Sequence, residues 1–149
     1  MARSDFRFAF RKRVYYPEID AQAVAYNSRY LEYFDIALTE YWRAAGFYEK
    51  SALVGDAEFH MVRGLVEYRA PILLDEEILI CCRTDRIGKS SITVALEIHG
   101  LVNGEQGEDL RASGETVQVH VAEVRGRPAP VPGWFITLLE GYEGRSLQS

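Results

Sequence analysis

The chain has 149 residues, of which 48% are hydrophobic, so it is long and apolar enough to form one compact domain with its own core. Its net charge of −5 gives no bulk electrostatic support for binding nucleic acid. No apolar run approaches the ~18 residues that indicate a membrane span, and the basic segment 1–13 lacks the apolar stretch of a secretory signal. We therefore expect a single domain over residues 1–149, located in the cytoplasm.

The two cysteines, Cys81 and Cys82, are adjacent in the sequence. Neighbouring residues on a strand point to opposite faces, so a disulfide between them is disfavoured and reduced thiols are the simpler interpretation. The sequence contains no Cys/His pattern with metal-ligand spacing and no glycine-rich phosphate loop. We expect neither a metal nor a cofactor.

The N-terminal part predicts a strand, a loop and one long helix. Partial alternation of aromatic residues over 6–16 indicates the strand. Residues 27–46 have helical periodicity, with Asn27 or Ser28 available as the N-cap and Gly46 as the end. The polar residues of this helix form one narrow stripe, so we expect the helix to be covered on most of its sides.

Strand patterns dominate the rest of the chain after an irregular stretch over residues 47–59. Short turns are expected at Gly88-Lys89 and Asn103-Gly104, and a short helix over residues 134–142. Four segments have the composition or the alternation of strands: 61–70, 77–85, 91–99 and 116–122.

Connections this short require antiparallel pairing of successive strands. The economical arrangement is an α+β fold in which a curved antiparallel sheet wraps around the long helix. One face of the sheet is apolar, and in the last strand it contains Val117, Val119 and Val121. The other face carries Thr, Glu, Gln and His, and is available to water or to a second subunit.

Residues 15–34, at the start of the helix, read YYPEIDAQAVAYNSRYLEYF. This segment resembles the signature of the 4-hydroxybenzoyl-CoA thioesterase family, and three later segments resemble its second strand (66–71), its basic turn (86–91) and its tail (127–132). The signature positions that match are Asp20, Ala21, Asn27, Tyr30 and Leu31.

The resemblance spans roughly residues 14–142. It implies the hotdog fold, hydrolysis of an acyl-CoA or aroyl-CoA thioester to a free acid and CoA, and assembly as a homodimer or homotetramer. Coenzyme A then enters only as part of the substrate. The sequence specifies neither the acyl group nor whether it arrives on free CoA or on a carrier protein.

The resemblance also assigns roles to two residues. The carboxylate at the Asp20 position acts as general base or nucleophile. The backbone amide at the Asn27 position, among the unpaired N–H groups at the positive end of the helix dipole, stabilises the oxyanion. Asp20 precedes Asn27 by seven residues, so the intervening loop can fold the carboxylate back toward these amides.

Two residues of that loop depart from the family pattern. Ala23 stands where the family usually has glycine, and Val24 where one large subgroup has histidine. Both belong to the expected substrate-binding loop. Alanine can replace glycine there without strain only if its φ is negative. Glu18, earlier in the loop, is expected to be solvated or to pair with Arg13.

Further substrate-binding candidates lie outside the loop. Tyr26 and Tyr30 are candidates for the acyl pocket, although tyrosine at helical spacing equally suits a core. The phosphates of CoA require basic groups at a rim, and Arg125 and Arg127 form a secondary cluster of these. The primary cluster, which is alternatively a solvated hairpin tip, is Arg86, Lys89, Ser90 and Ser91.

Two other functions remain open. A hotdog protein that binds an acyl-CoA or acyl-carrier ligand without hydrolysing it would explain the departures at Ala23 and Val24. A hotdog dehydratase acting on hydroxyacyl thioesters would need a histidine beside the catalytic acid, and none is close to Asp20 in the sequence.

Overall fold

The computed structural model describes residues 3–101, 104 and 107–148 of the chain. Asn103 of the expected turn therefore lies outside the described residues. The elements in chain order are η1 (Arg3–Asp5), β1 (Phe8–Arg13), η2 (Tyr16–Glu18), α1 (Arg29–Ala45), α2 (Phe47–Val54), β2 (Glu58–Tyr68), β3 (Glu77–Ile87), β4 (Ser91–Gly100), β5 (Leu110–Val121) and α3 (Gly133–Glu143).

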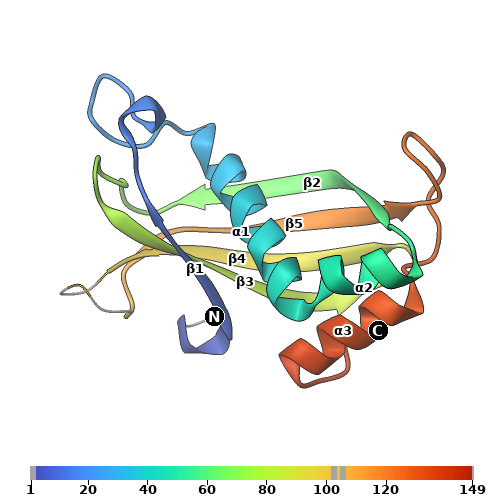
Figure 1. The fold of residues 1–149 in the computed structure, drawn as a ribbon. Helices are drawn as coiled ribbons and strands as arrows, with labels where there is room; N and C mark the ends of the chain where they lie inside the picture. The colour runs from blue at the N-terminus through green and yellow to red at the C-terminus, as the bar shows by residue number, and fades with distance from the viewer. Residues whose placement is uncertain (1–2, 102–103, 105–106, 149) are drawn as a thin grey trace.

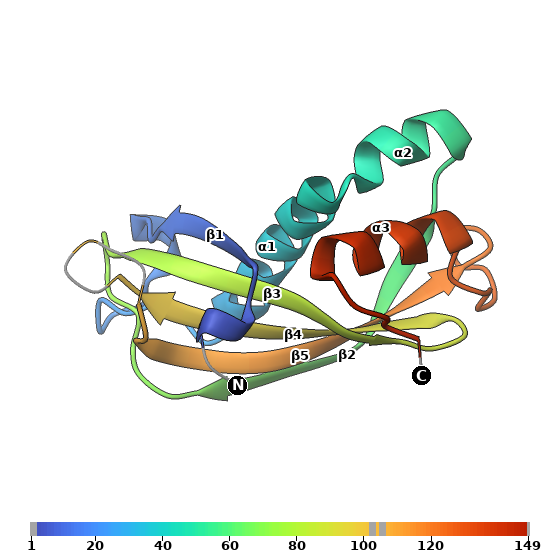
Figure 2. The same ribbon diagram turned by 90° about the horizontal axis from the view of Figure 1, so that it is seen from below.

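The strands form one antiparallel sheet in the order β1-β3-β4-β5-β2, with β2 at an edge. Helix α1 crosses one face of this sheet, and α3 lies on the same side near the far end (Figures 1 and 2). The predicted α+β architecture, with an antiparallel sheet curved around the long helix, is confirmed. The first strand is shorter than predicted because Tyr16–Glu18 form a 3₁₀ turn, and the last strand begins earlier, at Leu110.

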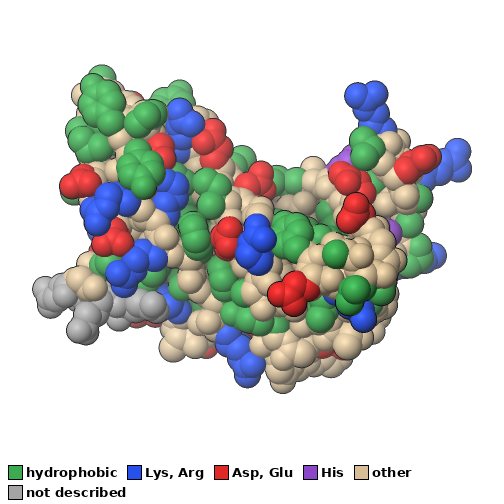
Figure 3. All heavy atoms as spheres, viewed as in Figure 1, with side chains coloured by type: hydrophobic (Ala, Val, Ile, Leu, Met, Phe, Trp, Pro, Cys, Tyr) green, Lys and Arg blue, Asp and Glu red, His purple; other side chains and the backbone are tan. Residues whose placement is uncertain are grey.

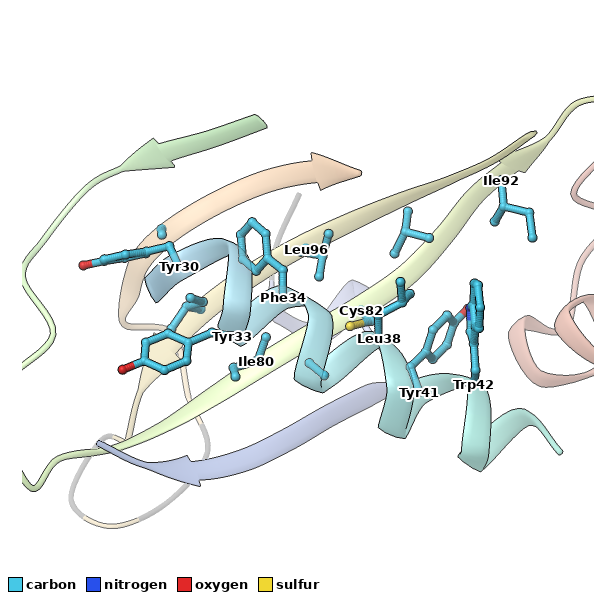
Figure 4. Packing of buried hydrophobic residues seen from close by; sticks show 14 of the residues in the cluster. Tyr30, Tyr33, Phe34, Leu38, Tyr41, Trp42, Ile80, Cys82, Ile92 and Leu96 are labelled. Atoms are coloured by element: carbon cyan, nitrogen blue, oxygen red, sulfur yellow. The ribbon is translucent and has the colours of Figure 1, made fainter. Parts of the chain in front are cut away.

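Helix α1 packs one aromatic face on the sheet (Figure 4). The expectation that it is covered on most sides is wrong for this chain, because Leu31 on the flank facing β2 and Ile36 on the outer side are 37% and 39% exposed. Apolar residues therefore occur on both the covered and the open side. The buried residues recur at a helical spacing of three or four: Tyr30, Tyr33, Phe34, Ala37, Leu38, Tyr41 and Trp42.

The segment predicted to be irregular contains a second helix, α2. Gly46 ends α1 with φ +98, a left-handed conformation that glycine adopts without strain, and α2 begins at the next residue. Phe47 is buried against Trp42 and Phe135, with ring centroids 5.4 and 4.7 Å away. Tertiary contacts of a single aromatic residue thus stabilise a helix that has little amphipathic pattern of its own.

The faces of β5 are the reverse of the prediction. Thr116 and Gln118 pair with Val94 and Ile92, whose side chains belong to the core beneath α1, and both polar residues are buried. Val117, which alternates with them, therefore lies on the opposite face of the sheet. Composition alone assigned the valines to the core, but the register with β4 places the polar residues there.

The adjacent cysteines follow the alternation that was expected. Cys82 lies in the core beneath α1, whereas Cys81 belongs to a small cluster with Phe6 and Ala95 on the opposite face. Both are buried free thiols, and burial raises the pKa of Cys81 to about 12. Neither thiol is therefore a reactive thiolate at neutral pH.

Candidate active site

The loop before α1 folds back on itself around Asp20. The backbone N–H of Asp20 donates to the carbonyl oxygen of Val24 at 3.0 Å, and the N–H of Ala23 donates to the carbonyl oxygen of Asp20 at 3.0 Å. The half-buried Asp20 carboxylate accepts a hydrogen bond from the backbone N–H of Gln22 at 2.8 Å. The loop itself therefore orients the carboxylate.

Ala23 does not have the negative φ that an unstrained alanine requires, because its φ is +61. The carbonyl oxygen of Ala23 accepts from the N–H of Leu74 at 3.3 Å, Val24 forms a bridge with Leu73, and the N–H of Ala25 donates to Ile72 at 2.8 Å. These contacts with the segment before β3 hold Ala23 in the left-handed conformation. The strain that glycine would relieve is therefore present in this loop.

Two backbone donors are unpaired where α1 begins. Ser28 is the N-cap residue, and its side chain makes no capping hydrogen bond. Within the described part of the chain, the N–H groups of Asn27 and Ser28 have no acceptor, while the N–H of Arg29 already donates to Tyr26. The carbonyl oxygen of Asn27 accepts from the Tyr68 hydroxyl at 3.0 Å, which fixes this turn to the end of β2.

A pocket of about 240 Å³ lies beside these amides. It brings together three of the predicted site residues, Val24, Asn27 and Tyr30, whereas Asp20 and the 54% exposed Tyr26 are not among its lining residues. Tyr30 is buried against Tyr68, with ring centroids 4.8 Å apart, so it serves both core and pocket. The other lining residues are Ala25, Tyr68, Arg69, Ala70 and Pro71.

Glu18 is neither solvated nor paired with Arg13, which corrects the prediction. Its carboxylate accepts hydrogen bonds from the Lys12 ammonium group and the Tyr33 hydroxyl, each at 2.8 Å. Burial alone would raise the pKa of Glu18, but these hydrogen bonds outweigh it and lower that pKa. Arg13 instead donates to Glu77 at 3.0 Å. Glu18 therefore connects the loop before α1 to β1 and to α1 itself.

Arg111 supports the segment on which the loop rests, and sequence reasoning missed it. Its guanidinium donates to the carbonyl oxygen of Pro71 at 2.8 Å and to the Glu76 carboxylate through both terminal nitrogens. Glu76 also accepts from the backbone N–H of Leu73 at 3.0 Å. Arg111 is remote from Asp20 in sequence, and only the pairing of β5 with β2 and β4 brings it to this end of the sheet.

The basic turn lies at the opposite end of the sheet from Asp20 (Figure 1). The carbonyl oxygen of Lys89 accepts from the N–H of Val131 at 2.9 Å, and that of Ser90 accepts from the N–H of His120 at 2.8 Å. A pocket of about 270 Å³ is formed by Lys89, Ser90 and residues 128–130. Within one chain, the structure does not bring the predicted phosphate-binding residues, including Arg86 and Ser91, to Asp20.

The loop with the secondary basic cluster, Arg125 and Arg127, projects at that same far end. Figure 3 shows basic side chains on this projection and apolar side chains gathered at the end that carries the Asp20 loop. The exposed apolar residues at the Asp20 end include Tyr15, Tyr16, Tyr26, Leu73 and Leu74.

A long helix packed on a curved antiparallel sheet is the hotdog fold, and here a loop with a carboxylate comes directly before the helix. Residues 15–139 match the thioesterase-like superfamily, and the chain belongs to this family. A thioesterase from Thermus thermophilus, solved in complex with coenzyme A and Zn, is 28% identical with a TM-score of 0.79, and the match covers 96% of this chain and 98% of that one.

The names of two curated relatives are consistent with this family. The acyl-CoA thioesterase YbgC of Haemophilus influenzae is 35% identical over 77 residues, a match that covers 51% of this chain and 57% of that protein. The acyl-CoA thioester hydrolase YbgC of Escherichia coli O157:H7 is 28% identical over 125 residues, covering 84% of this chain and 90% of that protein. A 4-hydroxybenzoyl-CoA thioesterase mutant in complex with 4-hydroxybenzoyl-CoA has a TM-score of 0.77 at 14% identity, which supports the fold alone.

No helix within residues 3–101, 104 and 107–148 is long and apolar enough to cross a membrane. Over the same residues, no group of three or more His, Cys, Asp or Glu side chains is arranged to hold a metal ion. The absence of a metal and of a cofactor stays a prediction.

Proposed function

We propose that this chain hydrolyses acyl-CoA thioesters to a free acid and CoA, with Asp20 as general base or nucleophile. The observation that carries the proposal is the pairing of an oriented carboxylate with unpaired amides at the start of α1, beside the pocket at Asn27. The names of the relatives and the CoA complex of the Thermus thermophilus thioesterase support the substrate class.

In the general-base route, the Asp20 carboxylate takes a proton from water as the water oxygen attacks the thioester carbonyl carbon. The carbonyl oxygen becomes an oxyanion, which the N–H groups of Asn27 and Ser28 stabilise as hydrogen-bond donors. Collapse of the tetrahedral intermediate breaks the C–S bond, and the departing thiolate takes the proton from Asp20. In the nucleophilic route, Asp20 attacks first, releases the thiolate and forms an anhydride that water then hydrolyses.

The resemblance to dimeric thioesterases leads us to propose a homodimer through β2. This strand has eleven residues and pairs only with β5 among the described residues, so its other edge is open to a second copy. The edge of the molecule along β2 is hollowed between its two projecting ends (Figure 3). Met61, Val62 and Leu65 of this strand are 37%, 63% and 39% exposed.

Such a dimer resolves the separation between Asp20 and the basic turn. A two-fold axis perpendicular to the sheet, beside β2, exchanges the two ends of the sheet while keeping α1 of both copies on the same side. The partner's Lys89 and the partner's Arg125 would then lie at the same end as Asp20 of the first copy. CoA is expected to extend from the Asn27 amide of one copy toward these basic groups of the other.

The test is thiol release from a panel of acyl-CoA and aroyl-CoA esters, comparing the unmodified protein with Asp20→Asn. We expect the substitution to lower kcat at least 100-fold, in line with the ~10²–10⁴-fold contribution of positioned acid–base groups. The matched control is Asp75→Asn, since the Asp75 side chain is 82% exposed and should leave kcat unchanged. Activity unaffected at Asp20→Asn would exclude the assigned role.

The binding-only alternative is favoured by one observation: apolar Val24 lines the pocket at the position where a family subgroup has histidine. Calorimetry with the same acyl-CoA panel separates the two functions. Tight binding without thiol release over hours would favour the binding protein, whereas rapid turnover would exclude it.

A further inference from the structure

The helix-facing side of β5 carries polar atoms that have no partner. Thr116 is 1% exposed and Gln118 is 5% exposed, yet the Thr116 hydroxyl and the Gln118 side-chain nitrogen make no hydrogen bond within the described part of the chain. A third such atom is the indole nitrogen of Trp42, a residue of α1 that is 8% exposed. Trp42 packs on Phe59, which pairs with His120, the next residue of β5 on this side.

Apolar packing of the core does not explain this choice of residues. A buried polar group without a hydrogen bond destabilises the folded state, and valine fills nearly the same space as threonine without that cost. Val117 and Val119 alternate with these two residues but lie on the opposite face. Polar groups retained beneath α1 instead point to a molecule that supplies their missing partners.

Access to Thr116 from the open edge passes over Gly64, its pairing partner on β2. A Cβ atom at Gly64 would lie 3.1 Å from the Leu31 Cδ2 atom and 3.1 Å from the Met61 sulfur. Leu31 and Met61 are each 37% exposed, so two adaptable side chains, rather than backbone, cover this position. An acyl chain that displaces them would lie between α1 and β2, above Thr116.

The strand register gives the distance from the reaction centre. The Tyr68 hydroxyl contacts the carbonyl oxygen of Asn27, and Tyr68 pairs with Ala112. Thr116 lies four residues further along β5 than Ala112, and Gln118 six, which corresponds to ~13 Å and ~20 Å at the rise of a β-strand. At ~1.3 Å per extended C–C bond, an acyl chain of about 12 carbons spans the first distance and one of about 16 carbons spans the second.

We propose that Thr116 and Gln118 are specificity-determining residues that bind a hydroxyl or oxo group on the distal part of the acyl chain. This inference rests on the proposed thioesterase function and adds the substrate class: medium-chain acyl groups that carry a polar substituent far from the thioester. The Thr116 hydroxyl can donate to or accept from that substituent, and the Gln118 amide nitrogen donates to its oxygen.

The test compares dodecanoyl-CoA with its ω-hydroxy derivative, which differ by one oxygen. We expect the unmodified protein to prefer the hydroxylated ester by at least tenfold in kcat/KM. The double variant Thr116→Val with Gln118→Met should lose that preference, while Val119→Thr, on the opposite face of the same strand, should retain it. An unchanged ratio in the double variant, or no preference in the unmodified protein, would overturn the proposal.

Calorimetry with thioether analogues of the same two esters, which cannot be hydrolysed, separates this proposal from the thioesterase proposal. If neither ester releases a thiol, the hydrolytic function fails, and the binding ratio alone decides the role of Thr116 and Gln118. Tighter binding of the hydroxylated analogue that disappears in the double variant supports the role. Equal binding of both analogues contradicts the role. A double variant that becomes more stable but binds the two analogues in an unchanged ratio also contradicts it.

Discussion

Ala23 places backbone strain in the loop that orients Asp20. Its φ of +61 is imposed by backbone hydrogen bonds and a bridge to residues 72–74. A left-handed conformation costs a residue with a Cβ ~1–2 kcal/mol. The loop that orients Asp20 is therefore held against a local preference by tertiary contacts, which keeps the carboxylate in place but makes the loop less stable.

Ala23→Gly is expected to stabilise the protein. Relief of the left-handed strain outweighs the ~0.4–1 kcal/mol that glycine adds to the conformational entropy of the unfolded chain, which leaves a net gain of ~0.5–1 kcal/mol. Urea unfolding measures this free energy. Ala21→Gly in the same loop is the control: the φ of Ala21 is not positive, so that substitution should destabilise the protein. A loss of stability at Ala23→Gly would show that the loop is unstrained.

Among the elements, the segment between β2 and β3 has the clearest supporting role. Arg111 on β5 holds this segment through Pro71 and Glu76, and the segment in turn pairs with the Asp20 loop at Ala25 and Val24. Arg111 also donates to Asp109 at 2.9 Å. Hydrogen bonds from Arg111 lower the pKa of Asp109, and they lower that of Glu76 despite the opposing effect of burial.

These lowered pKa values predict acid sensitivity. A carboxyl group whose pKa is lower in the folded state stabilises the fold above its unfolded pKa, and this contribution is lost as the pH falls through the folded value. For Glu76 and Asp109 the loss lies below the ordinary values of 4.5 and 3.8. Urea unfolding between pH 7 and pH 3 should therefore show a smaller pH dependence in Arg111→Met than in the unmodified protein.

The control for this series is Arg43→Met, which removes a largely exposed arginine paired with Glu40 on α1. It should leave the pH dependence unchanged, because exposed ion pairs contribute little to stability. Equal pH profiles for Arg111→Met and the unmodified protein would mean that the ion pairs of Arg111 do not contribute to folding.

Elements with strong periodicity were predictable from the sequence, and those that depend on tertiary contacts were not. The long helix and the strands β3 and β4 carry their pattern locally, and so does the match that selects Asp20 and Asn27. Helix α2 has a single buried aromatic residue, Phe47, and no local signal. Arg111 and the sign of φ at Ala23 depend on strand pairing across the sheet, which no local pattern encodes.

At the scale of the whole molecule, the open edge of β2 and the separated basic turn both point to a second copy. A lysine in place of an exposed apolar residue on an edge strand opposes edge-to-edge pairing. Val62→Lys is therefore expected to shift the protein toward the monomer in sedimentation-velocity experiments and to reduce thiol release with it. Val62 is 63% exposed in the single chain.

Val124→Lys is the matched control. Val124 is 67% exposed and lies on the loop between β5 and α3, outside the β2 strand itself. This variant should sediment like the unmodified protein. A dimer that persists in Val62→Lys would place the interface on another surface.

The placement of Asp20 and Lys89 at opposite ends of the sheet has a genetic consequence. In the dimer that we propose, each reaction centre takes its carboxylate from one copy and its phosphate-binding groups from the other, so two differently defective chains are expected to complement each other. A mixed dimer of Asp20→Asn with Lys89→Glu contains one centre with both defects and one with neither. Random reassociation of equal amounts should restore about a quarter of the normal centres, because half of the dimers are mixed and each has one intact centre.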